Sequence, residues 1–154
     1  MSSRTRLLGV DFGHVRIGLA VGDPESRIAS PLATYHRRGR EHDRAYFRLV
    51  TAEQGVGRLV VGLPVHLDGR EGRKAAEARA FGAWLAEVTG VPVVYWDERF
   101  TTVEAEGFLL DAGLTKKRRK ARRDRVAAQI MLQSYLDAGC PAGEGAGPLD
   151  EPTR

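Results

Sequence analysis

The feature that most constrains the fold is a pair of apolar runs near the N-terminus, joined by a very short connection. The first reads RLLGVDF (residues 6–12) and the second reads RIGLAVGD (16–23). Two such runs around a short turn predict an antiparallel hairpin. Asp11 stands at the end of the first run, where a buried carboxylate costs free energy unless something pairs with it. The hairpin therefore predicts a sheet and raises the question of what Asp11 pairs with.

The rest of the chain alternates strand and helix patterns. We expect a third strand near Ser30–Arg37, a helix between Glu41 and Gln54, a strand over 58–64, a helix over Arg73–Thr89, a strand over 91–98, a helix from Thr101 or Thr102 to Gly113, and a last helix after the basic run, in RVAAQIMLQSYLDAG. This order predicts an α/β fold with a mixed five-stranded sheet, antiparallel at one side, and with helices on both faces. The first, fourth and fifth strands should run parallel.

The length of 154 residues suits one domain with its own core. We expect this domain over residues 1–139, and a disordered tail over 140–154, which is rich in Gly, Pro and acids. Cys140 is the only cysteine, which excludes an internal disulfide and suits a reducing cytosol. No apolar run is long enough for a signal peptide or a membrane span. These features predict a cytoplasmic protein that does not enter a membrane.

The positive charge is concentrated in one segment. Residues 116–125, KKRRKARRDR, hold eight of the 24 Lys and Arg residues and one of the 20 acids, so the remaining chain has 16 basic and 19 acidic residues. A basic cluster of this kind is typical of a surface that contacts a phosphate backbone. The alternative is a solvated charged helix or loop with no partner.

The acids at the ends of the parallel strands indicate a metal site. Asp11 closes the first strand and Asp97-Glu98 closes the fifth, so these acids should meet at one edge of the sheet, where ligands gather in such folds. Clustered carboxylates repel one another unless a cation neutralises them, and oxygen ligands favour Mg²⁺ or Mn²⁺ over zinc. Asp124 would complete the set. The alternative for Asp124 is an N-cap at the start of the last helix.

Four blocks in order carry a resemblance to a known family: VDFGHVRIGLAVGD, VVGLPVHLDGREG, WDERFTTVEA and KKRRKARRDRVAAQIMLQSYLD. Over residues 6–138 the chain resembles the YqgF/RuvX family, Holliday-junction-resolvase-like nucleases of the RNase H-like fold that are implicated in maturing precursor small-subunit ribosomal RNA. The resemblance implies that Asp11, Glu98 and Asp124 are the catalytic, metal-binding acids.

The resemblance also guides the choice between neighbouring residues. Strand alternation points Asp97 and Glu98 to opposite faces, and the resemblance selects Glu98 for the metal. His14 stands where a small hydroxyl residue is more usual in the family, and His66 where an amide is common. Neither replaces a carboxylate, so they bear on the substrate and leave the chemistry unchanged.

The predicted function is a nuclease that uses Mg²⁺ or Mn²⁺ to cut structured nucleic acid, either RNA or branched DNA, with precursor ribosomal particles as a further partner. The expected nucleic-acid contacts are Arg16, Lys116, Lys117, Arg118, Arg119, Lys120, Arg122 and Arg123. Lysine and arginine contacts to phosphate position a nucleic acid without reading its sequence. The oligomeric state is not predicted.

The sequence leaves three alternatives open. One is a resolvase of Holliday junctions or other branched DNA. Another is a non-catalytic nucleic-acid-binding factor in transcription or ribosome assembly, against which an intact set of three acids argues. The last is an actin-like ATPase, which shares a strand–turn–strand phosphate loop but needs two such lobes, more than 154 residues supply.

Overall fold

The computed structural model describes residues 5–98 and 115–142. In chain order, its elements are β1 (Arg6–Asp11), β2 (Arg16–Asp23), β3 (Ile28–His36), α1 (Arg40–Glu53), β4 (Val56–Leu63), α2 (Arg73–Thr89), β5 (Val93–Asp97) and α3 (Lys116–Asp137). The hairpin, the third strand and the alternating elements as far as β5 are thus where the sequence predicts them, with bounds shifted by a few residues.

The sheet has five strands in the order β3-β2-β1-β4-β5. Strands β1, β2 and β3 pair antiparallel, whereas β1, β4 and β5 run parallel. The mixed α/β sheet predicted from the order of elements is therefore confirmed. Because β1 and β5 both run parallel to β4, their C-terminal residues, Asp11 and Asp97, lie at one edge of the sheet.

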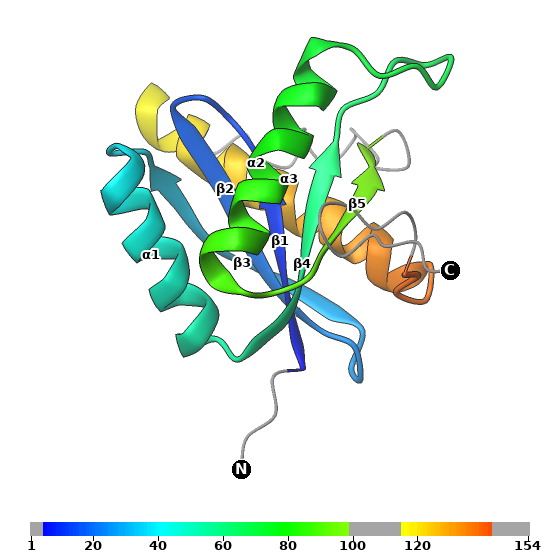
Figure 1. The fold of residues 1–154 in the computed structure, drawn as a ribbon. Coiled ribbons are helices and arrows are strands. Elements are labelled where there is room, and N and C mark those ends of the chain that lie inside the picture. The colour runs from blue at the N-terminus through cyan, green and yellow to red at the C-terminus, as the bar shows by residue number, and fades with distance from the viewer. Residues whose placement is uncertain (1–4, 99–114, 143–154) are drawn as a thin grey trace.

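Each face of the sheet buries its own apolar cluster (Figure 1). Helices α1 and α2 cover one face, where Phe47, Phe81 and Leu85 pack on Leu8, Val10 and other strand residues. Helix α3 crosses the other face, where Met131, Leu132 and Tyr135 pack on Leu7, Ala20 and Val60. The two-sided burial explains why the central strands read as nearly continuous apolar runs.

Helix α3 begins earlier than the sequence suggests. The basic run forms its first turns, and the hydroxyl of Thr115 caps the helix by accepting a hydrogen bond from the backbone N–H of Arg118 (3.1 Å). The interpretation of Asp124 as an N-cap is therefore wrong, because this residue lies well inside the helix. The error arises because a run of charged residues lacks the apolar periodicity that marks a helix, although Lys and Arg are good helix formers.

Two predicted segments fall outside the described residues: the helix between Thr101 and Gly113, and most of the tail over 140–154. Among residues 5–98 and 115–142, no helix is long and apolar enough to cross a lipid bilayer.

Candidate active site

Asp11 and Glu98 meet at the C-terminal edge of the parallel strands. Asp11 is the last residue of β1, and Glu98 follows β5 directly. The strand between them, β4, places Gly62 beside Trp96 in the ladder. The two carboxyl groups are close enough to share a hydrogen bond. The prediction that acids from the ends of β1 and β5 would meet is thus confirmed for this pair.

Gly62 makes the room that Glu98 occupies. A Cβ atom at position 62 would collide with Oε2 of Glu98 and lie 3.1 Å from its Cδ and Cγ atoms. A glycine inside a buried strand often marks such a close approach. In the sequence this glycine is only one residue of the strand expected over 58–64, so its role at the site is not apparent there.

Asp124 approaches Asp11 from α3, on the face of the sheet that α1 and α2 do not cover. It projects from the interior of α3, and its Oδ2 accepts a hydrogen bond from Nε of Arg16, at the start of β2 (2.5 Å). Gly18 permits this approach, because a Cβ atom there would collide with the backbone carbonyl of Asp124. The helix therefore packs close enough to β2 to bring a third carboxylate near Asp11.

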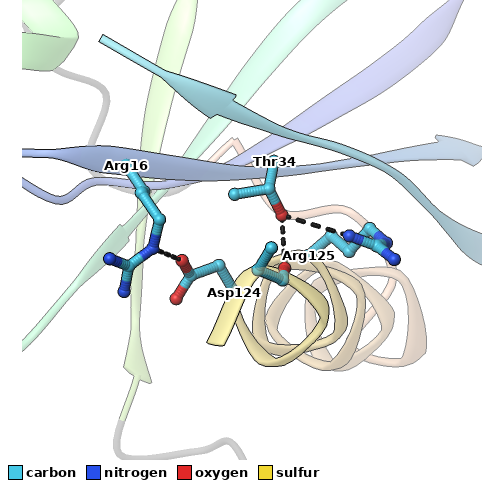
Figure 2. A network of polar contacts seen from close by, with 5 residues as sticks. Arg16, Thr34, Asp124 and Arg125 are labelled. Carbon is cyan, nitrogen blue, oxygen red and sulfur yellow. Dashed lines mark hydrogen bonds and ion pairs between the residues drawn. The ribbon is translucent and has the colours of Figure 1, made fainter. Parts of the chain in front are cut away.

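Figure 2 shows the polar contacts that hold α3 in this position. Beside the pair of Arg16 and Asp124, the hydroxyl of Thr34 on β3 donates to the carbonyl of Ala121, one turn earlier in α3. Arg125 in turn donates from Nη1 to the Thr34 hydroxyl across 3.5 Å. Both β2 and β3 thus fix the stretch of helix that carries Asp124.

The electrostatics of the carboxylate pair favour a shared proton or a cation. Burial raises the pKa of Asp11 well above its ordinary value, and the nearby carboxylates of Glu98 and Asp124 raise it further. Burial also raises the pKa of Glu98, with a contribution from the charge of Asp97 and an opposing one from its hydrogen bond with Asp11. A divalent cation would remove the same repulsion that these shifts reflect.

Two hollows flank Asp11. The first, about 250 Å³, is lined by Asp11, Gly62, Glu98 and residues of α2 that include Lys74 and Glu77; we call it the carboxylate hollow. The second, about 270 Å³, is lined by Asp11, Arg16 and Asp124. Asp11 is the one acid that lines both, which is the position expected of a ligand shared by two cation sites.

The three acids do not form one compact ligand cluster. Within residues 5–98 and 115–142, no group of three or more His, Cys, Asp or Glu side chains is placed to hold a single metal ion together. Asp11 and Glu98 form a pair, and Asp124 faces Arg16 on the other side of Asp11. The donor set nevertheless fits Mg²⁺ or Mn²⁺, because all three groups are carboxylates.

The remaining predicted site residues lie around this edge or along α3. His14 lines both hollows and forms an ion pair with Glu77 on α2 (2.9 Å). His66 lines neither hollow. On α3 the side chains of Lys116, Lys117, Arg118, Lys120 and Arg123 are exposed, while Arg119 and Arg122 are partly buried. Arg16 is paired with Asp124, a partner that sequence reasoning did not anticipate.

Comparisons with known proteins agree with this architecture. A family model described as "RuvX: Holliday junction resolvase" matches residues 5–138. The chain is 46% identical over 142 residues to a protein of Rhodopirellula baltica named "Putative pre-16S rRNA nuclease", covering 92% of this chain and 82% of that protein. A protein of the same name from Anaeromyxobacter is 46% identical over 132 residues, covering 86% of this chain and 96% of its own.

A solved structure shows the same fold at lower sequence identity. RuvC of Thermus thermophilus, in complex with a Holliday junction substrate, superposes with a TM-score of 0.55 at 16% identity, covering 92% of this chain and 98% of that one. This likeness confirms the RNase H-like fold. With the family model covering nearly all of the domain and relatives above 40% identity, the chain belongs to the RuvX family.

Proposed function

We propose that this chain is a nuclease that uses Mg²⁺ or Mn²⁺ to hydrolyse phosphodiester bonds in structured nucleic acid, and that it acts in the processing of precursor small-subunit ribosomal RNA. The observation that carries the proposal is the pair of Asp11 and Glu98, two carboxyl groups in contact at the C-terminal edge of a parallel sheet. A purely structural pair of this kind would destabilise the fold without return, so its presence favours a catalytic use.

Asp11, Glu98 and Asp124 are the groups that would hold the cations. Bound there, divalent ions supply a water of lowered pKa and stabilise the charge on the leaving oxygen of a phosphodiester. Asp11 lines both hollows, so it would serve a cation in either one. Glu98 would hold a cation in the carboxylate hollow, and Asp124 would hold one in the hollow that it lines with Arg16. Asp124 would hold a cation only after giving up its contact with Arg16.

Basic residues near the acids would bind and orient the substrate. Lys74 lines the carboxylate hollow, where its ammonium group is placed to contact a phosphate beside the scissile bond. Arg16, once released from Asp124, offers a planar guanidinium to a neighbouring phosphate. The exposed cations of α3, which project from the first turns of the same helix that carries Asp124, would contact the backbone further along.

The choice of precursor ribosomal RNA rests on the relatives. Those above 40% identity carry the name of a nuclease for pre-16S ribosomal RNA, and their length is similar to that of this chain. The second candidate substrate is branched DNA, which the family description names. Both share the structured phosphate backbone that the basic helix suits.

The test is cleavage by the purified protein of a precursor ribosomal RNA fragment and of a four-way DNA junction, each with Mg²⁺ or Mn²⁺. We expect cleavage of the RNA fragment, its loss in Asp11→Asn, and normal cleavage in Glu87→Gln, a matched change at an exposed acid of α2 away from the hollows. Cutting of the junction alone would favour the resolvase. Binding of both substrates without cleavage in either metal would favour the non-catalytic factor.

A further inference from the structure

A third and larger hollow adjoins the carboxylate hollow. It measures about 610 Å³ and lies between α2 and the segment that joins β3 to α1. Its lining is Phe12, Phe81 and Trp84, the two cations Arg37 and Arg40, and a rim that includes His14, Glu77 and Ala80. We call it the aromatic hollow. Its volume lies in the range usual for ligand pockets.

Three aromatic rings and one guanidinium form its wall. The rings of Phe12 and Phe81 are 4.7 Å apart between centroids, and those of Phe81 and Trp84 are 5.4 Å apart. The guanidinium carbon of Arg37 lies 5.5 Å from the centre of the Phe12 ring and 5.3 Å from that of Phe81. Aromatic rings and a guanidinium plane are the groups on which unpaired nucleobases stack in proteins.

Arg37 is fixed in place by a buried acid. Its Nε donates to Oδ2 of Asp43 (3.1 Å), a carboxylate that is 1% exposed and also accepts hydrogen bonds from the Tyr35 hydroxyl (2.6 Å) and the Arg38 backbone N–H (2.9 Å). The terminal amino groups of Arg37 make no hydrogen bond to the described residues, so they are left for a ligand. A guanidinium held this way loses little freedom when it binds.

The aromatic hollow has two cations on its lining, Arg37 and Arg40. Its two acids each have a partner, since Asp43 accepts from Arg37 and Glu77 contacts the ring of His14, whereas Arg40 makes no ion pair with the described residues. The hollow also shares Phe12, His14 and Glu77 with the carboxylate hollow. A strand whose scissile phosphate lies at Asp11 and Glu98 would therefore bring an adjacent nucleotide to the aromatic wall.

We propose that the aromatic hollow binds one unpaired nucleobase of the substrate, next to the scissile phosphate, and so gives this nuclease a preference for cleavage beside single-stranded nucleotides. The inference rests on the proposed nuclease function, because continuity with the carboxylate hollow is what selects a nucleic acid as the occupant. Arg37 and Trp84 are then specificity residues: they contact a base without reading its hydrogen-bonding edge.

The test compares the binding of a short labelled oligoadenylate with that of the same backbone carrying abasic residues, in EDTA so that nothing is cut. Both probes have the same phosphates, so the difference between them reports the bases alone. We expect wild type to bind the oligoadenylate about tenfold more tightly, the effect of roughly one stacked base. A Trp96→Phe variant leaves Trp84 as the only tryptophan, and the oligoadenylate should quench its fluorescence more than the abasic strand does.

Two alanines on α2 provide matched variants. Ala80 is exposed and lines the aromatic hollow. Ala76, one turn earlier, is also exposed but lines none of the three hollows. Ala80→Gln should remove the preference for bases and leave abasic binding unchanged, and Ala76→Gln should behave as wild type. Equal binding of both probes by wild type, or a preference that survives Ala80→Gln, would overturn the inference alone. A wild-type protein that bound neither probe nor any structured nucleic acid would overturn the proposed function as well.

Discussion

The Nε–H of Arg16 donates to Oδ2 of Asp124 across 2.5 Å, and this ion pair ties the start of β2 to the interior of α3. Both side chains are partly shielded, with exposed fractions of 30% and 23%. The pair thus has two functions available to it: it positions the helix on the sheet, and it holds a carboxylate near Asp11, where we propose that a cation binds.

Asp124→Asn separates these functions. The amide keeps an oxygen that accepts from Arg16, so we expect the melting temperature to stay within a few degrees of that of wild type. The negative charge is lost, so cleavage should stop, and nucleic acid should bind at least as tightly because one anion has left a basic helix. Cleavage, thermal melting and binding in EDTA are the measurements. Full activity of the variant would remove Asp124 from the metal site.

A matched control uses the true cap of the same helix. Thr115→Ala removes the hydroxyl that accepts from Arg118, which should lower the free energy of unfolding by about 0.5–2 kcal/mol. Cleavage should persist in this variant at temperatures where it remains folded. Loss of cleavage in both variants to the same degree would point to helix stability as the cause of both effects.

Asp11→Asn tests the raised pKa of the central carboxyl. The unfolded chain releases the Asp11 proton near pH 4, but burial and the neighbouring acids keep the pKa of the folded group well above that. The free energy of unfolding should therefore fall as the pH rises from about 4 through the folded pKa. Asp11→Asn should be more stable than wild type at about pH 7, and this advantage should vanish toward pH 4. Denaturant titrations across this range supply the measurement.

The same variant reports cation binding without any cleavage assay. Mn²⁺ should raise the melting temperature of wild type by binding the folded state, and it should leave that of Asp11→Asn unchanged. An equal rise in both proteins would place the cation elsewhere.

The contribution of Asp43 to the free energy of unfolding should change with pH in the opposite direction to that of Asp11. Burial by itself would raise the pKa of this carboxyl, but hydrogen bonds from the Arg38 backbone, Tyr35 and Arg37 outweigh it and lower the pKa. The pKa of Tyr35 is raised to about 12, first by burial and then by its bond with Asp43. This carboxylate therefore stabilises the fold above its unfolded pKa of about 3.9, and the stabilisation is lost as the pH falls through the folded pKa.

Asp43→Asn should lower the free energy of unfolding at neutral pH by about 2 kcal/mol, the scale of hydrogen bonds to a charged group. The difference from wild type should shrink as the pH falls from about 4 through the lowered pKa of the folded Asp43, below which both side chains are neutral. Denaturant titrations from neutral to acid pH supply the measurement. A difference that did not depend on pH would show that shape, not charge, is what position 43 contributes.

Most of the fold is predictable from local patterns because each element has a clear period or boundary. Residues Arg73–Thr89 carry apolar side chains at helical spacing and end at Gly90, whose φ of 73° closes the helix as expected. The start of α3 is different. Its first turns have no apolar face, and Thr115 is the only local signal for where the helix begins.

The candidate site is predictable only as far as strand topology determines it. Parallel strands bring Asp11 and the end of β5 to one edge, so their meeting follows from the order of elements. The contact of Asp124 with Arg16 depends on how closely α3 packs on β2, which Gly18 decides and which no spacing along the chain reveals. The aromatic hollow combines the turn after β1, the segment that joins β3 to α1, and helices α1 and α2, so it exists only in the folded chain.

Gly62→Ala tests whether the position of Glu98 matters for function. The added methyl group would collide with the Glu98 carboxylate, so this side chain must move away from Asp11. We expect a folded protein that has lost cleavage and the stabilisation by Mn²⁺. Combining Gly62→Ala with Glu98→Gln should reduce cleavage no further than either change alone, because both remove the same ligand. Additive losses would indicate that Gly62 acts through the backbone of β4 instead.

The exposed cations in the first turns of α3 should govern how binding depends on salt. If Lys116 and Lys117 contact phosphates, the logarithm of the binding constant should fall linearly with the logarithm of the salt concentration, with a slope of about −0.7 to −0.9 for each phosphate contacted. Lys116→Gln combined with Lys117→Gln should make this slope less steep by up to about 2. The matched control is Arg44→Gln with Arg48→Gln, which removes two exposed cations from α1, on the opposite face of the sheet. Fluorescence anisotropy over a salt series measures both. Equal changes in the two variants would mean that net charge governs binding, and that α3 has no special part in it.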